Sequence, residues 1–183
     1  MTFNCADINT FKSDLDNNIL VAQNLKKDSH ASIKIQSLLN ITIYALATRF
    51  LEGSIKHVIY NCAIMRGDNK TQLSILENEL KKINNPEYSN IKSEFSKHLN
   101  FDITQGLNNH RYTSTDISFL NEIVKNRHKN VHATHDSADW YSTNLKDIIS
   151  DFPKEYPGLI SILTYLDSIT YDSETKSFKD TII

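Results

Sequence analysis

The strongest chemical signal in the sequence is a group of basic and titratable side chains between residues 125 and 135. The group comprises Lys125, Arg127, His128, Lys129, His132 and His135. At about 100° per helical residue, the three histidines lie within roughly 60° of one another, on a single helix face. Arg127 and Asn130 flank that face, and Val131 is expected to attach the turn to the core. A helix with this face can hold either a metal ion or an anion.

Three interpretations of this segment compete. Cationic side chains near a helix C-terminus complement the helix dipole and can simply be solvated. His128, His132 and His135 have a spacing that suits zinc, although the fixed charges of Arg127 and Lys129 disfavour a cation. In the third interpretation, arginine grips a phosphodiester in a bidentate manner while histidine moves protons near neutral pH. That chemistry requires no metal.

The composition predicts a single helical domain. A chain of 183 residues, of which 39% are hydrophobic, can bury a sizeable core. Its four glycines and three prolines are too few for the many turns of an all-β fold. The net charge of −2 gives no overall attraction for nucleic acid, so any such contact requires a local basic patch.

Cysteine usage and hydropathy favour a cytoplasmic protein. Cys5 and Cys62 are too few for a disulfide framework, and we expect free thiols in a reducing compartment. We expect no signal peptide, because no basic region followed by an apolar stretch occurs near Met1. No apolar run approaches the roughly 20 residues of a membrane span, so no membrane contact is expected.

Apolar spacing predicts the elements that position the segment. The expected helices cover residues 6–27, a long and central 31–66, 72–83, 86–98 and 116–135, with one or two closing helices over 143–151 and 157–169. Ser29 and Thr115 are the expected helix starts, and Gly53 is a close-packing point or a bend. We expect residues 100–114 to form a loop. We expect one domain over residues 1–171 and a polar, disordered tail over 172–183.

The segment resembles the HEPN superfamily. Arg127, four intervening residues and His132 match its Arg-x(4–6)-His motif, with His128 as the polar residue after the arginine. The stretch from Thr48 to Gly53 is similar to the family's acidic position, with Glu52 as the acid. The resemblance covers roughly residues 29–166 in architecture and is closest to stand-alone prokaryotic groups linked with phage defence. Ala133 departs from the pattern, since many members carry glycine there.

The resemblance implies an all-α, HEPN-like bundle that acts as a metal-independent endoribonuclease of a toxin or anti-phage system. Such domains form homodimers through the motif helix, share one cleft between two motifs, and cut RNA by attack of the 2′-OH without a cofactor. His132 would be the general acid or base, and Arg127 would stabilise charge on the phosphate. His128 or Asn130 would hold the phosphate or orient His132.

Two points stay open at the level of sequence. Glu52 could fix Arg127 from the neighbouring helix, or it could simply pair with Lys56 one turn away. The whole domain could also be a non-catalytic HEPN module that binds RNA, a nucleotide or a partner protein. An antitoxin or another defence-system protein is a further expected partner.

Overall fold

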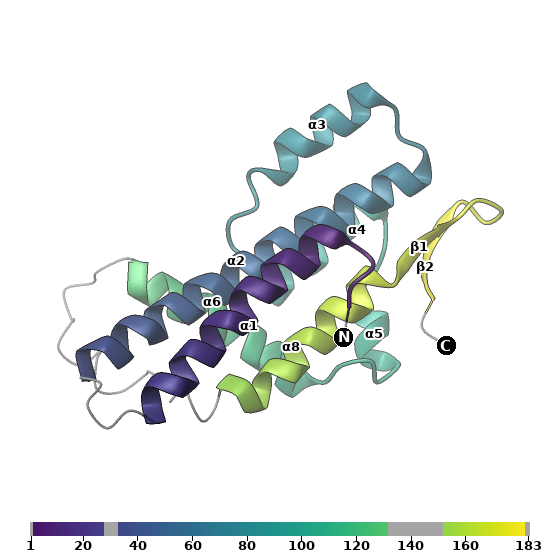
Figure 1. The fold of residues 1–183 in the computed structure, drawn as a ribbon. Coiled ribbons are helices and arrows are strands. Elements are labelled where there is room, and N and C mark those ends of the chain that lie inside the picture. The colour runs from purple at the N-terminus through teal and green to yellow at the C-terminus, as the bar shows by residue number, and fades with distance from the viewer. Residues whose placement is uncertain (1, 28–32, 132–151, 182–183) are drawn as a thin grey trace.

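Long helices dominate the computed structural model, which describes residues 2–27, 33–131 and 152–181 (Figure 1). The helices are α1 (Ala6–Lys27), α2 (Ile33–Arg66), α3 (Lys70–Leu80), α4 (Tyr88–Leu99), α5 (Thr104–Asn108), α6 (Ser114–Val131) and α8 (Phe152–Asp167), followed by strands β1 (Ile169–Asp172) and β2 (Ser177–Asp180). The predicted all-α fold, one domain around a long helix, is confirmed. Within the described ranges, no helix is both long and apolar enough to cross a membrane.

The long helix α2 is the central element, and it packs against α1, α3, α4, α6, α8 and β1. Its apolar residues point in several directions, so neighbours cover it on several sides. The side chains of Tyr44, Phe50 and Ile55 are completely buried. α2 ends at Arg66, as the sequence predicts.

Helix α1 lies alongside α2, and its bounds are those predicted (Figure 1). Phe11 of α1 comes so close to Gly53 of α2 that a Cβ at position 53 would lie 2.6 Å from the phenyl ring. Glycine therefore allows the two helices to approach here. This confirms the close-packing role that the sequence left as one of two alternatives.

Helix α6 begins two residues earlier than expected, because Thr113 and Asp116 cap it reciprocally. Thr113 Oγ1 accepts a hydrogen bond from the Asp116 N–H at 3.3 Å, and the Asp116 carboxylate accepts one from the Thr113 N–H at 2.7 Å. Thr115, the predicted start, lies inside the first turn instead. Gly158 of α8 packs directly against the Asp116 carboxylate, so this cap also sets the approach of α6 to α8.

Other boundaries differ from the prediction for local reasons. α5 forms inside the expected loop over residues 100–114, where the Asp102 carboxylate accepts from the Thr104 N–H at 3.0 Å. α8 begins at Phe152 rather than at Pro157, because the buried Phe152 ring packs against Tyr44 and anchors an additional turn. α3 and α4 lie within three residues of their predicted bounds. The predicted cap at Ser29 and the predicted helix over residues 143–151 lie outside the described residues.

The expectation of a disordered tail after residue 171 is wrong for the described part of that segment. β1 and β2 pair in antiparallel fashion with Tyr171 opposite Phe178, and the two ring centroids lie 5.1 Å apart. The Asp172 carboxylate closes the turn by accepting from the Glu174 N–H at 2.9 Å and from Lys179 Nζ at 2.8 Å. The apolar alternation is too short for the sequence pattern to indicate a strand.

Candidate functional site

A pocket of about 380 Å³ between α1, α2 and α6 is lined by two of the predicted site residues, Glu52 and Arg127. The remaining lining residues are Phe11, Ala45, Arg49, Gly53 and Lys56. Glu52 lies in the middle of α2, and Arg127 lies near the end of the described part of α6. Packing of α6 against α2 brings these two positions to one pocket.

Arg127 is half-buried and connects the pocket to the loop between α3 and α4. Its NH1 group donates a hydrogen bond to the Asn84 carbonyl oxygen at 3.0 Å. A guanidinium carries five N–H donors, so this one bond among the described residues uses only part of its donor capacity, and an anion in the pocket is a suitable acceptor for the others. The carbonyl thus fixes the direction of the side chain without neutralising its charge.

Glu52 pairs with Lys56 rather than with Arg127. The Lys56 Nζ lies 2.6 Å from Glu52 Oε1, and both side chains are about one quarter exposed. This confirms the local i,i+4 pair that the sequence left open as an alternative. Among the described contacts, no hydrogen bond or ion pair joins Glu52 to Arg127, so the direct pair implied by the family resemblance is not formed.

The pocket has an excess of positive charge. Arg49, Lys56 and Arg127 contribute cations, and the single carboxylate, Glu52, is paired with Lys56. The Arg49 guanidinium lies over the Phe11 ring, 5.9 Å from its centroid, in a cation–π arrangement. Two planar guanidinium groups at one pocket suit the oxygens of a phosphate. An anion is therefore the ligand that this pocket favours.

Arg49 and Lys56 are the charged pocket residues that the sequence analysis missed. Arg49, Glu52 and Lys56 follow one another at spacings of three and four, so they share one face of α2. That spacing is visible in the sequence. The face of α2 that meets α6 is set by tertiary packing, which a single sequence does not display.

The other predicted site residues have no described side-chain position. His132 lies outside the described residues, as does His135 of the metal interpretation. His128 and Asn130 belong to α6, but their side chains also fall outside what the structure describes. The backbone from Arg127 to Val131 is helical, and this places the arginine one turn before the described end of the helix.

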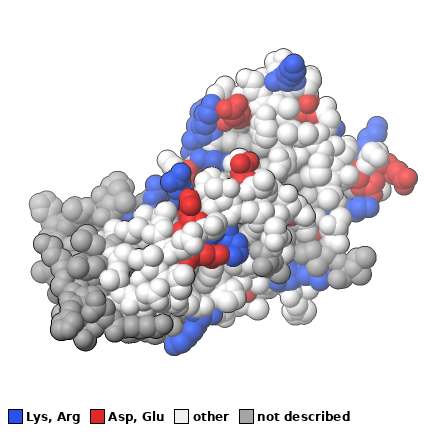
Figure 2. Space-filling view, in the orientation of Figure 1, with Lys and Arg blue, Asp and Glu red and all other residues white. Residues whose placement is uncertain are grey.

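Charge on the visible face of the molecule is mixed. Figure 2 shows basic and acidic side chains interspersed over this face, without one broad basic surface. In comparisons with protein-family models, curated proteins and solved structures, nothing matches this chain. The pocket and the motif that contributes Arg127 are therefore the basis for assigning a function.

Proposed function

We propose that this protein is a metal-independent endoribonuclease of the HEPN type that acts as a toxin or in anti-phage defence. The observation that carries the proposal is the position of Arg127, the arginine of the Arg-x4-His motif, in a pocket with Arg49 and Lys56. A phosphodiester is an anion whose oxygens a guanidinium binds in a bidentate manner. The excess of cations in the pocket supports RNA as the substrate.

The proposed reaction is attack of the ribose 2′-oxygen on the adjacent phosphorus. His132 removes the proton from the 2′-OH, and the new oxygen–phosphorus bond forms as the bond to the 5′-oxygen breaks. The leaving 5′-oxygen takes up a proton, so the products are a 2′,3′-cyclic phosphate and a 5′-hydroxyl. Arg127 stabilises the negative charge that develops on the phosphate oxygens. His128 or Asn130 holds the phosphate or orients His132.

The proposed active form is a homodimer through α6, in which two motifs share one cleft. One His132 then acts as the base while the His132 of the second copy protonates the leaving oxygen. Two pockets side by side also double the local positive charge, which offsets the net charge of −2 on each chain.

RNA cleavage in the presence of a chelator tests the proposal. The wild type is expected to cut a mixed RNA pool, whereas Arg127→Ala and His132→Asn should each lose at least about 100-fold in rate with the oligomeric state unchanged. Unchanged cleavage by both variants contradicts the proposal.

Two matched controls show whether an effect is specific to the proposed site. One removes a positive charge and the other removes an imidazole, each outside the pocket. Lys70→Ala removes an exposed cation of α3, which belongs neither to the pocket nor to the proposed dimer helix. His110→Asn removes an exposed histidine at φ 57, a conformation that asparagine tolerates. Both controls are expected to retain cleavage.

The alternative function is a non-catalytic HEPN module that binds RNA, a nucleotide or a partner protein. The same excess of cations around Arg127 favours it, because anion binding requires no general base. In that case the wild type binds RNA with an affinity that falls steeply with salt and falls further in Arg127→Ala, and no cleavage product forms.

A further inference from the structure

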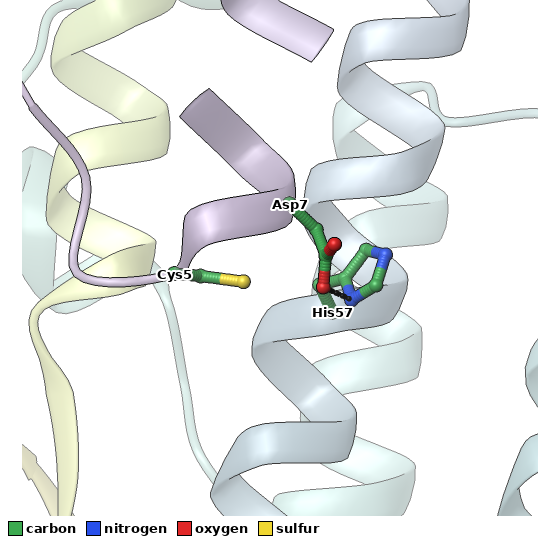
Figure 3. Close-up of side chains that lie close together, drawn as sticks. All are labelled: Cys5, Asp7 and His57. Atoms are coloured by element: carbon green, nitrogen blue, oxygen red, sulfur yellow. Dashed lines mark ion pairs between the residues drawn. The ribbon is translucent and has the colours of Figure 1, made fainter. Parts of the chain in front are cut away.

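Three side chains with different metal-binding chemistry meet where the N-terminal segment joins α1 (Figure 3). Cys5 directly precedes α1, Asp7 lies in its first turn, and His57 lies on α2. In Figure 3 the Asp7 and His57 side chains point at each other, and the Cys5 sulfur extends toward them. The Cys5 Sγ, an Asp7 carboxylate oxygen and a His57 ring nitrogen all lie within 4.8 Å of one another.

The separation of Asp7 and His57 is compatible with a shared metal ion. His57 Nδ1 lies 3.3 Å from Asp7 Oδ2, the distance of a long ion pair. In a tetrahedral zinc site with bonds of about 2.0–2.1 Å, a nitrogen and an oxygen ligand lie about 3.3 Å apart. This edge of the tetrahedron is therefore already in place. A thiolate ligand about 2.3 Å from the same ion would complete the group, and the Cys5 sulfur lies within 4.8 Å of both other ligand atoms.

Contacts around Cys5 hold the cysteine in position. Phe3 is buried against Phe50, with the ring centroids 6.1 Å apart. The Asn9 side chain accepts from the Phe3 N–H at 2.8 Å and donates to the Cys5 carbonyl oxygen at 3.1 Å. The Asn4 N–H donates to the Asp167 carboxylate of α8. A cysteine that is fixed by its neighbours is preorganised to bind, because little further ordering is required.

The charges of the three groups balance a dication. A thiolate and a carboxylate together carry two negative charges, and a neutral imidazole adds none. Lys56, which directly precedes His57 in the sequence, forms an ion pair with Glu52, with 2.6 Å between Lys56 Nζ and Glu52 Oε1. In contrast, the fixed charges of Arg127 and Lys129 lie in sequence beside the histidine group His128, His132 and His135. Sulfur, nitrogen and oxygen donors together are typical of zinc and not of calcium or magnesium.

We propose that Cys5, Asp7 and His57 form a zinc site that joins the start of α1 to the middle of α2. Three protein ligands leave the fourth position of a tetrahedral ion for solvent or for another ligand. The imidazole packs against Phe11, with the ring centroids 6.0 Å apart, and Phe11 in turn lines the Arg127 pocket. Zinc at this site stabilises the helix pair on which that pocket is built, and it takes no part in RNA cleavage.

Titration with Co²⁺ under non-thiol reducing conditions tests the site, because cobalt replaces zinc and reports a bound thiolate by its sulfur-to-metal charge-transfer band. One equivalent of Co²⁺ is expected to give this band together with the d–d bands of a four-coordinate ion, and Zn²⁺ should displace it. Cys5→Ser is expected to lose the charge-transfer band. Asp7→Asn and His57→Asn should weaken Co²⁺ binding, and Asp7→Asn should fold normally, because that side chain is 65% exposed.

The matched controls are Cys62→Ala, which removes the other thiol, and His132→Asn, which removes the middle histidine of the sequence group His128, His132 and His135. Both should keep the band. A wild-type protein without a charge-transfer band, or a band that persists in Cys5→Ser, overturns the proposal.

A second measurement does not depend on any variant. Zinc that binds the folded state raises the melting temperature of the wild type, and this shift should be clearly smaller in Asp7→Asn at the same zinc concentration. An equal shift in both proteins contradicts the assignment. The ribonuclease proposal is tested separately, because Asp7→Asn is expected to keep RNA cleavage in chelator below its melting temperature.

Discussion

Arg66, the last residue of α2, holds three parts of the chain together through one guanidinium group. Its Nε and NH2 donate to the two carboxylate oxygens of Asp68 at 2.8 and 2.6 Å, and NH1 donates to the His98 carbonyl at 2.8 Å. The same group lies over the Phe178 ring of β2, 5.9 Å from its centroid. A lysine has no planar fork with which to make these contacts at once.

We therefore expect Arg66→Lys to lower the free energy of unfolding by about 1–3 kcal/mol, since a bidentate pair is lost and a carbonyl loses its donor. The hydrogen bond from Arg66 holds the pKa of the Asp68 carboxyl below its ordinary value of 3.8. Because the folded pKa is the lower one, this contribution is present above the unfolded pKa and is lost as the pH falls through the folded pKa.

Urea denaturation at neutral and acidic pH measures this effect. The difference between wild type and Arg66→Lys should shrink below about pH 4. Arg49→Lys, a matched change at an exposed arginine, is expected to stay within about 0.5 kcal/mol of wild type. A difference that does not depend on pH would show that the Asp68 pair contributes little.

The site residues differ in how far a sequence can predict them. The position of Arg127 in the basic segment was predicted from residue type and spacing, whereas Glu52 was proposed only through the family resemblance. The Glu52–Lys56 pair was predictable as well, since it is local. The bond from Arg127 to the Asn84 carbonyl was not, because its partner is a backbone group 43 residues away. The Cys5–His57 group depends in the same way on how α1 packs against α2.

At the scale of elements, the apolar periodicity predicted which helices exist better than where they begin. The bounds of α1 match the prediction because the helix begins and ends where its apolar stripe does. The start of α6 was misplaced because two capping side chains, Thr113 and Asp116, decide it and apolar residues do not. The β hairpin was missed because it is short and depends on the paired Tyr171 and Phe178 rings and on the turn at Asp172. Short elements held by such specific contacts escape a periodicity argument.

The junction of α6 and α8 yields a prediction at this scale. A Cβ at position 158 would overlap the Asp116 carboxylate, which is the acceptor of the α6 cap. Gly158→Ala should therefore lower the free energy of unfolding by about 1–3 kcal/mol, because the helices must separate or the cap must break. Asp116→Ala alone should cost about 1 kcal/mol through loss of the cap.

A double-mutant cycle distinguishes overlap from a general effect of alanine in α8. If the overlap is the cause, Gly158→Ala should cost clearly less in the Asp116→Ala background, since most of the obstructing atoms are gone. Strictly additive costs in thermal or urea unfolding would contradict this account of the junction.

At the scale of the whole molecule, buried hydroxyl and thiol groups connect the helices. The ring centroids of Tyr88 and Tyr112 lie 6.1 Å apart, and those of Tyr112 and Tyr165 lie 5.6 Å apart. Tyr112 donates to the Ile103 carbonyl at 2.6 Å, and Tyr156 of α8 donates to the Asp16 carboxylate of α1 at 2.9 Å. These contacts join α1, α4 and α8: the Tyr112 hydroxyl is buried, and the Tyr156–Asp16 pair is partly buried.

Burial of these groups raises their pKa values. It is the largest cause for Tyr112, Tyr156 and Tyr165, and it raises the pKa of the Cys62 thiol from 9.0 to about 12. The folded state keeps each of these hydroxyl or thiol groups neutral, because the ionised group would lose its hydration on burial. The unfolded chain has no such restriction and ionises at the ordinary pKa.

The protein should consequently lose stability in alkaline solution. Because each folded pKa is above its unfolded value, the contribution is complete below the unfolded pKa of 9 to 10 and is lost as the pH rises toward the folded pKa. Each group adds a slope of at most about 1.4 kcal/mol per pH unit in that window. Urea denaturation from about pH 8 to about pH 11 measures the slope, which Tyr165→Phe should reduce by removing one ionisable group from the core. Parallel curves for wild type and Tyr165→Phe would mean that Tyr165 ionises without unfolding.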